Sequence, residues 1–370
     1  MEIHGWCDER FGALRECFER NFTDRSDVGA SFAATLEGEY VVDLWGGHLD
    51  AARTSPWQED TIVCAFSVTK TMTALAALVL VDRGELRLTD RVTRYWPEYG
   101  QHGKEATEVR QFLAHTAGVP AFAERLSHAD LYDWDRIIGV LERQSPRWPP
   151  GERCVYHGLT YGFLVGEIVR RVAGMSLGAF FAEHVATPLR ADYHIGLDAA
   201  HFDRTGDMVL VTPMPERLAR ELHRYHGAVP DMVPPTTNTS DFRRAELPAV
   251  NGHGNARSVV RVQTVVANGG TAFGVKLLAP ATVEQIFSEE HVLEAMGARQ
   301  GVGYALSGLF ARQMPKGVRS SYWFGAGGST VLLDHTNRAC MSYVMNGMDL
   351  NMPRDRRASS LTRAFYEGLR

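Results

Sequence analysis

Apolar residues near the amino end of the chain follow a helical period. Phe11, Leu14, Phe18 and Phe22 are separated by three or four positions, so their side chains share one face of a helix. The spacing predicts an amphipathic helix over residues 8–22. Such a helix buries its apolar face against a sheet or another core element.

Candidate strands for that sheet follow directly. Two β-prone runs, residues 30–36 and 40–45, flank a Glu-Gly-Glu turn and predict a hairpin. A third short strand is expected at residues 61–66. Residues 68–83 are apolar on nearly every side, which predicts a helix buried all round.

The middle of the chain is dominated by helical periods, separated by loops rich in Pro, Gly and Asp. The predicted helices cover residues 107–115, 133–144, 160–173 and 176–186. Residues 213–255 contain Pro-Pro and Asn-Gly pairs and little periodicity. Long stretches of this kind are more typical of an irregular cover or a lid than of a core element.

The carboxyl-terminal part returns to a mixed pattern. We expect a helix at 256–267, strands at 304–310, 330–333 and 340–344, and a last helix at 355–369. The simplest architecture is an α+β fold in which an antiparallel sheet is flanked by helices. Both chain ends, residues 1–90 and 250–370, would build that sheet domain, and residues 91–249 would form an inserted, mainly helical domain.

Composition and charge exclude several classes of protein. The 370 residues include 39 Lys plus Arg and 44 Asp plus Glu, for a formal net charge of -5, and no basic run. This balance favours neither nucleic-acid nor anionic-membrane binding. The longest wholly apolar run, residues 74–81, is far shorter than the roughly 20 residues of a membrane-spanning helix. The amino end has no secretory pattern, so we expect a cytoplasmic protein.

Cysteine usage agrees with that compartment. The five cysteines form no Cys-x-x-Cys pair, and an odd count spread over a long chain favours reduced, mostly buried thiols. We expect no structural metal and no cofactor.

The sharpest chemical feature is Ser67-Val68-Thr69-Lys70, at the start of the predicted buried helix. A serine hydroxyl becomes a nucleophile when a neighbouring base takes its proton. Residues three apart share a helix face, so Lys70 would stand beside Ser67. Burial disfavours a charged lysine and can lower its pKa into a useful range. The ordinary alternative is a helix N-cap at Ser67 and a surface lysine at Lys70.

Two further segments carry candidate chemistry. Tyr156 lies between a Pro-Pro-Gly turn and the helix predicted from residue 160, where a phenol can relay a proton; the alternative is an ordinary amphipathic contact. Residues 323–329, Trp-Phe-Gly-Ala-Gly-Gly-Ser, lead into a predicted strand. Glycines let a backbone approach a ligand closely, and a strand N–H can stabilise an oxyanion; the alternative is a simple turn.

Taken together, these motifs resemble the serine β-lactamase and penicillin-binding-protein superfamily. The chain is most similar to its family VIII carboxylesterase branch, which looks like class C β-lactamase, from about Gly5 to Leu369. The resemblance rests on the order and spacing of five motifs: Val41-Val42-Asp43-Leu44-Trp45-Gly46-Gly47, Phe66-Ser67-Val68-Thr69-Lys70, His115-Thr116-Ala117-Gly118, Tyr161-Gly162-Phe163-Leu164-Val165-Gly166-Glu167 and Gly325-Ala326-Gly327-Gly328-Ser329.

The resemblance implies roles for particular residues. Ser67 would be the nucleophile, and Lys70 and Tyr156 the acid/base pair. The backbone N–H groups of Ser67 and Ala326 would form the oxyanion hole. His115 would end a helix and structure the loop behind the site.

Two departures from the β-lactamase pattern affect the expected substrate. Gly158 stands where the β-lactamases have an Asn that holds the substrate amide, and Trp323 stands where they have a Lys that attracts the β-lactam carboxylate. Both changes remove polar groups suited to peptide-like anions. Trp323 resembles the Trp-x-Gly form of the esterases and would supply an apolar shelf. The expected substrate contacts are Trp323, Phe324, Gly325, Gly158 and His157.

Two other patterns are interpreted as structural. Gly174-Met175-Ser176-Leu177-Gly178 matches the Gly-x-Ser-x-Gly nucleophile elbow, but that elbow requires a preceding strand. Here a predicted helix precedes it, so Gly174 is expected to be a C-cap and Ser176 an N-cap. His223, His226 and Asp231 lack further ligands at the usual metal spacing, and we expect a solvated or lid segment.

The leading hypothesis is a serine carboxylesterase acting on a small-molecule ester through a Ser67 acyl-enzyme. An acyltransferase that passes the acyl group to an alcohol or amine is the first alternative. Amide or β-lactam hydrolysis and a non-catalytic scaffold are weaker ones. The sequence leaves the acyl and alcohol groups open, and also the oligomeric state, a homo-oligomer included.

Overall fold

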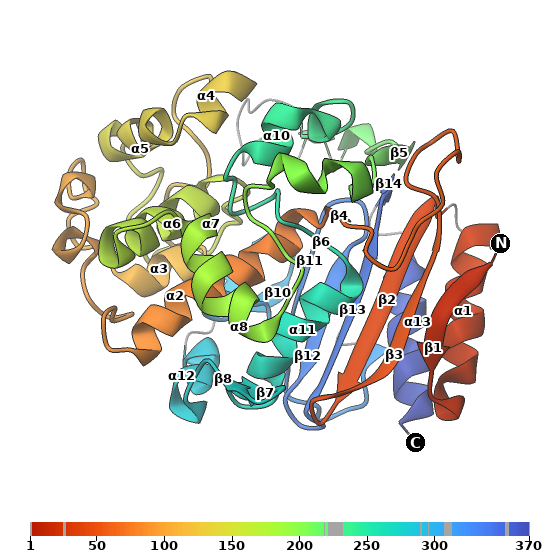
Figure 1. Cartoon of the computed structure of the whole chain (residues 1–370). Helices are drawn as coiled ribbons and strands as arrows, with labels where there is room; N and C mark the ends of the chain where they lie inside the picture. Colours follow the sequence, from red (N-terminus) through yellow and green to blue (C-terminus); the bar gives the residue numbers. More distant parts are fainter. Residues whose placement is uncertain are drawn as a thin grey trace.

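The protein is described from a computed structural model, which covers residues 2–24, 27–217, 219–220, 232–288, 291–294, 296–306, 313–351 and 355–369. Its centre is a six-stranded antiparallel sheet (Figure 1). In spatial order the strands are β1 (Ile3–Cys7), β3 (Glu39–Gly47), β2 (Gly29–Leu36), β13 (Ala339–Met345), β12 (Thr330–Asp334) and β11 (Ser320–Phe324). The antiparallel fold class predicted from the sequence is confirmed.

The two ends of the chain meet in the middle of this sheet. Strand β2 pairs with β13 over seven residue pairs, from Ala30 opposite Met345 to Leu36 opposite Ala339. All but the last residue of β2 are buried, which explains its nearly continuous apolar sequence. A strand covered on both faces has no polar side to present to water.

Helices cover both faces of the sheet (Figure 1). Helices α1 (Gly12–Asp24) and α13 (Arg357–Gly368) pack together on one face, where the rings of Phe11 and Phe365 stack 5.2 Å apart. Helix α11 (Ala256–Ala267) packs against β13 and β2 on the other face. The helix predicted at residues 256–267 is confirmed with the same bounds.

Helix α2 (Thr69–Asp82) links the sheet to the helical part of the molecule. Its residues from Thr69 to Leu80 are all buried, as its apolar circumference predicted. It packs against α6 (Thr160–Ala173) and α7 (Leu177–Phe181). The Ser67-Val68-Thr69-Lys70 segment thus lies where the sheet and the helical region meet.

The remaining elements are short. The helices are α3 (Val109–Leu113), α4 (His128–Tyr132), α5 (Trp134–Arg143), α8 (Thr187–Leu189), α10 (Ser240–Arg244) and α12 (Pro280–Glu284). The minor strands are β4 (Val63–Cys64), β5 (Val209–Thr212), β6 (His253–Gly254), β7 (Thr271–Ala272), β8 (Val275–Lys276), β9 (His291–Leu293), β10 (Ala298–Gln300) and β14 (Gly347–Asp349). The division into two domains at residues 90/91 and 249/250 stays a prediction.

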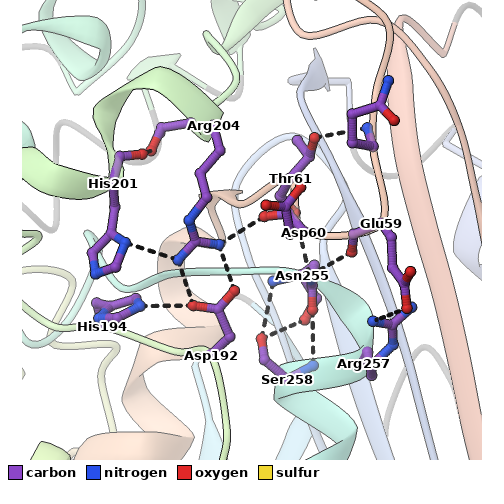
Figure 2. Close-up of polar contacts among 12 residues, drawn as sticks. Glu59, Asp60, Thr61, Asp192, His194, His201, Arg204, Asn255, Arg257 and Ser258 are labelled. Atoms are coloured by element: carbon purple, nitrogen blue, oxygen red, sulfur yellow. Dashed lines mark hydrogen bonds and ion pairs between the residues drawn. The ribbon is translucent and has the colours of Figure 1, made fainter.

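A polar junction holds the segment after α8 against the segment before β4 (Figure 2). The Arg204 guanidinium donates to both carboxylate oxygens of Asp192, at 2.5 and 2.7 Å, and to the backbone oxygen of Asp60 at 2.7 Å. His194 bonds the same carboxylate at 2.8 Å. The backbone of His194 also pairs with His253 in β6, so the junction extends to the strand that pairs with β4, just before Ser67.

Several predicted elements differ from the structure. The strand expected at residues 61–66 is confined to β4, because Phe66 already begins a 3-10 turn. Strands β1 and β11 were missed. Of the strand expected at 304–310, Ala305 forms isolated bridges to Gln300 and Tyr322, and residues 307–310 lie outside the described part. No helix among the described residues is both long and apolar enough to span a bilayer.

The segment expected to be an irregular lid is partly core. Leu247, Ala249, Asn251 and His253 are each at most 2% exposed. Asn251 satisfies this irregular backbone, because its side-chain amide donates to the carbonyls of Phe242 and Ala245 and its oxygen accepts from Leu247. A buried side-chain amide thus replaces the hydrogen bonds of a regular element, and this replacement leaves no periodic pattern in the sequence.

Candidate active site

Ser67 lies on a tight turn between β4 and α2. The turn is a 3-10 segment, Phe66–Val68, whose flanking residues are buried while Ser67 is partly exposed. Phe66 has a φ of 47°, an uncommon value for a bulky residue. The Ala65 N–H donates to the Gly252 carbonyl at 2.8 Å, which ties the turn to β6. The arrangement presents the serine hydroxyl at the surface of an otherwise buried turn.

Lys70 stands one helical turn after Ser67 and is 1% exposed. Its Nζ lies 3.1 Å from Ser67 Oγ and 2.8 Å from each of the carbonyl oxygens of Gly158 and Ala249. Burial holds the pKa of Lys70 well below its usual range, since a buried ammonium loses its hydration. The Ser-x-x-Lys spacing therefore places an amine of lowered pKa beside the serine.

Tyr156 completes a chain of three polar groups. Its hydroxyl lies 2.7 Å from Ser67 Oγ, and the Lys70 ammonium nitrogen is 4.9 Å from the centre of its ring. Burial raises the pKa of Tyr156 to about 12, although hydrogen bonds with Ser67 and Trp323 act in the opposite direction. The phenol is therefore protonated at neutral pH and can donate to the serine oxygen.

The loop that carries Tyr156 is held on both sides by His115, which is itself buried. The Val155 N–H donates to the His115 carbonyl and the His157 N–H to His115 Nδ1, each at 3.1 Å. His115 follows α3, as expected of a helix end, and its φ of 59° turns the chain sharply. The expectation that His115 structures the loop behind the site is met by these two bonds.

The glycine-rich segment lies against the turn that carries Ser67. It follows the edge strand β11, and a Cβ added to Gly325 would stand 2.4 Å from the Ala65 carbonyl oxygen and 3.0 Å from the Phe66 Cβ. Only glycine permits that approach. Ala326, to which the resemblance assigns the second oxyanion N–H, is the next residue after this close approach.

The predicted substrate contacts fall into two groups. Trp323 is 2% exposed and stacks on His115 at 5.5 Å between ring centres, and His157 is fully buried. The Trp323 ring also lies 5.9 Å from the Tyr156 ring between centres, so the indole belongs to the aromatic cluster around His115. Its role as an apolar shelf for the substrate stays a prediction. Phe324 and Gly158 are partly exposed, and Gly325 is buried.

Sequence reasoning missed the two carbonyl groups that hold Lys70. Gly158 was identified for the side chain it lacks, but its carbonyl oxygen accepts a hydrogen bond from Lys70. Ala249, in the segment expected to be a lid, supplies the other. Backbone acceptors have no residue signature; the apolar run from Leu247 to Val250 was the available signal of burial.

The two patterns interpreted as structural are placed as follows. Gly174 ends α6 with a φ of 72°, and Ser176 caps α7 by accepting from the Ala179 N–H, so Ser176 is an N-cap and no elbow. His223, His226 and Asp231 lie outside the described residues. Within the described residues, no group of three or more His, Cys, Asp or Glu is placed to hold a metal ion.

Comparison with known proteins identifies the family that this chain matches. The family model described as Beta-lactamase matches residues 18–364. The chain is 31% identical over 297 residues to the esterase/beta-lactamase LipL of Mycobacterium tuberculosis. That match covers 75% of this chain and 67% of LipL.

Two solved structures resemble the chain over its whole length. One is a family VIII carboxylesterase, with a TM-score of 0.91 and 38% identity. The other is a penicillin-binding protein homologue from Caulobacter crescentus, with a TM-score of 0.91 and 35% identity. Each alignment covers 100% of both chains.

Proposed function

The chain belongs to the beta-lactamase family, and on that premise we propose that it is a serine carboxylesterase that works through an acyl-enzyme on Ser67. One observation carries the proposal: Ser67 Oγ lies within hydrogen-bonding distance of both Lys70 Nζ and the Tyr156 hydroxyl. The similarity to a family VIII carboxylesterase and to LipL supports an ester as the substrate.

The surroundings of Lys70 support its role as the base of the first step. A neutral amine has two hydrogens and one lone pair. The carbonyls of Gly158 and Ala249 can take both hydrogens, which leaves the lone pair for the Ser67 O–H. Ser67 then gives its proton to Lys70 while its oxygen bonds to the ester carbonyl carbon.

Tyr156 is suited to the proton transfer that follows. Its O–H gives a proton to the departing alkoxide as the carbon–oxygen bond breaks, and the Lys70 ammonium returns a proton to the phenolate. In the second step a water loses its proton to the same pair and attacks the acyl carbon. Ser67 leaves with a proton, and the carboxylic acid is released.

The negative charge on the ester oxygen needs donors that are already in place. We assign this role to the backbone N–H groups of Ser67 and Ala326. The close approach of Gly325 to Ala65 supports the assignment, because it brings the two backbones together without an intervening side chain.

The residues at positions 323 and 158 favour neutral esters over β-lactams. No cationic side chain stands at position 323, where the buried indole of Trp323 lies instead. Gly158 offers no side-chain amide to hold a peptide-like substrate. We therefore propose a small ester without an anionic group near the reacting carbonyl, and expect β-lactams and amides to be much poorer substrates.

Intact-mass measurement tests the proposal directly. The protein is mixed with a panel of short p-nitrophenyl esters, thioesters, amides and a chromogenic cephalosporin. We expect esters to add one acyl mass that maps to Ser67, and Ser67→Ala to lose both the adduct and turnover. Hydrolysis at the wild-type rate by Ser67→Ala would overturn the assignment. No adduct with any acylating probe would favour a non-catalytic scaffold.

The same acyl-enzyme can be attacked by an alcohol or amine, so acyl transfer is a second outcome of this experiment. Adding a primary alcohol to the ester assay separates the two reactions by their products. A transesterified product that exceeds the acid at millimolar alcohol would identify an acyltransferase. Acid as the main product would identify a hydrolase.

A further inference from the structure

The glycine-rich segment that carries Ala326 is a tight turn. The Gly328 N–H donates to the Gly325 carbonyl at 3.2 Å, and the Gly325 N–H donates to the Ser329 carbonyl at 2.7 Å. Gly327 has a φ of 87°, the conformation that a type II turn requires at its third position. The turn's own hydrogen bonds thus use the N–H groups of Gly325 and Gly328, on either side of Ala326.

A buried ionic cluster lies directly beneath this turn. Arg357, at the start of α13, is 1% exposed, and Asp27, just before β2, is fully buried. The Arg357 NH1 donates to Asp27 at 2.7 Å and to the Gly347 carbonyl at 2.7 Å. The hydroxyl of Tyr343 donates to the same carboxylate at 2.6 Å. The cluster therefore joins the segment just before β2 to the start of α13.

The other side of the guanidinium reaches the turn itself. Arg357 NH2 donates to the Gly327 carbonyl at 2.6 Å and to Asp355 at 2.9 Å. The backbone N–H of Asp349 donates to the same Gly327 carbonyl at 3.1 Å. A Cβ on Gly328 would lie 2.9 Å from Arg357 NH2, so the turn rests on the guanidinium without an intervening side chain.

Burying an arginine is costly unless its donors are all used. Asp27 and Asp355 balance its charge, and the carbonyls of Gly347 and Gly327 accept its remaining N–H groups. Holding the Gly327 carbonyl fixes the peptide between Gly327 and Gly328 and, through the turn, the direction of the Ala326 N–H. A planar guanidinium can bond Asp27 and Gly327 at once, which an ammonium of similar length cannot do.

We propose that Arg357 is a positioning residue that orients the Ala326 N–H toward the reacting carbonyl. This inference rests on the proposed function and names a residue that lies 30 positions after the glycine whose carbonyl it holds. Its action is indirect: Arg357 holds the turn, and the turn presents the donor. Because an oxyanion donor contributes mainly in the transition state, a displaced turn slows acylation while ground-state binding of the ester is little changed.

Arg357→Lys tests the proposal, because it retains the positive charge beside Asp27 but cannot also reach Gly327. We expect kcat for a short p-nitrophenyl ester to fall about 10- to 50-fold, less than the roughly 10²- to 10³-fold loss on removing an oxyanion donor. KM should stay within about threefold. The inhibition constant of an alkylboronic acid, whose tetrahedral Ser67 adduct places an oxygen at the same N–H groups, should rise by the same factor as kcat/KM falls.

The control is Glu167→Gln in α6. Glu167 is also fully buried and also bonds two arginines, Arg170 and Arg171, but it does not touch the turn. We expect this variant to lose thermal stability while kcat and boronate affinity stay within about twofold. If Arg357→Lys does not fold, the double variant Asp27→Asn with Arg357→Gln removes both buried charges and takes its place.

The results separate failure of the inference from failure of the proposed function. Wild-type kcat and boronate affinity in a folded Arg357 variant would overturn the positioning role. A matched loss in Glu167→Gln would do the same, since it would trace the effect to general stability. Turnover that persists in Ser67→Ala would overturn the proposed function instead, whatever the Arg357 variants show.

Discussion

Two lysines of this protein are almost completely buried, and their surroundings differ by one group. Lys70 is 1% exposed and Lys104 is 0% exposed. The Nζ of Lys104 donates to three backbone carbonyls at the end of α5, those of Leu141, Glu142 and Gln144. The Nζ of Lys70 contacts two carbonyls and the hydroxyl of Ser67. Each amine also lies 4.9 Å from the centre of a tyrosine ring.

The third partner determines which protonation state each site accepts. Carbonyls only accept hydrogen bonds, so three of them require all three hydrogens of an ammonium. A hydroxyl donates or accepts, so the Lys70 site fits a neutral amine as well. The charge of Lys104 is also supported by Glu105 and Glu142, which limit the lowering of its pKa by burial to about 8. At Lys70 burial is the cause of the shift, and it holds the pKa well below its usual range.

The comparison teaches that burial alone does not mark a catalytic lysine. Lys104 donates to carbonyls at the C-terminus of α5, where a positive charge is favourable, and it stays charged at neutral pH. Lys70 has a partner that can give it a proton. Substitutions at the two sites should therefore separate activity from stability.

Lys70→Met should have the largest effect. We expect kcat/KM for a short p-nitrophenyl ester to fall about 10⁴-fold, the upper range for loss of a general base. Stability should change little, because removing a buried amine of lowered pKa offsets the lost hydrogen bonds to the carbonyls of Gly158 and Ala249. Ester kinetics together with thermal unfolding check both parts. Activity within tenfold of wild type would show that another group takes the Ser67 proton.

Tyr156→Phe should have the next largest effect, and it tests the group that shares Ser67 with Lys70. We expect a loss of about 10²- to 10³-fold in kcat for alkyl esters, whose alkoxide must be protonated as it leaves. Esters of p-nitrophenol should lose less, since that leaving group needs little protonation. Equal losses for both substrates would contradict a role for Tyr156 as the acid.

Lys104→Met should reverse the pattern of Lys70→Met. Three buried carbonyls lose their donor, and unsatisfied groups of this kind cost about 1–3 kcal/mol each before relaxation. We expect a net loss of about 2–4 kcal/mol in the free energy of unfolding, measured by urea denaturation. The kcat of the folded variant should stay within about twofold of wild type. A large loss of kcat would remove the distinction between the two sites.

The sequence predicted much of this site, because its motifs record side-chain chemistry. The spacing of Ser67 and Lys70, the order of the five motifs and the buried circumference of α2 are all visible in the residues, and the family is confirmed. The roles assigned to Ser67, Lys70 and Tyr156 stay predictions, although the structure brings the three groups together.

The parts that were missed depend on backbone groups and distant contacts. The carbonyls of Gly158 and Ala249 carry no residue signature, and Arg357 reaches Gly327 only after the chain ends have paired. The stacking of the Trp323 indole on His115 joins two segments far apart in the chain, a contact that no local pattern records.

The smallest expected effect is on how the free energy of unfolding depends on pH at the two buried lysines. An unfolded lysine has a pKa near 10.4, whereas the pKa of Lys104 in the folded protein is about 8. Between these values the unfolded chain binds more protons, so the stability contributed at Lys104 rises with pH across that window, by at most about 1.4 kcal/mol per pH unit. The difference in unfolding free energy between wild type and Lys104→Met should therefore grow from pH 8 to 10. Burial also lowers the pKa of Lys70, so the wild-type protein should gain stability relative to Lys70→Met as the pH rises toward 10. Urea denaturation of the three proteins at unit pH intervals checks both slopes, and a Lys104→Met difference that stays constant from pH 8 to 10 would contradict the lowered pKa of Lys104.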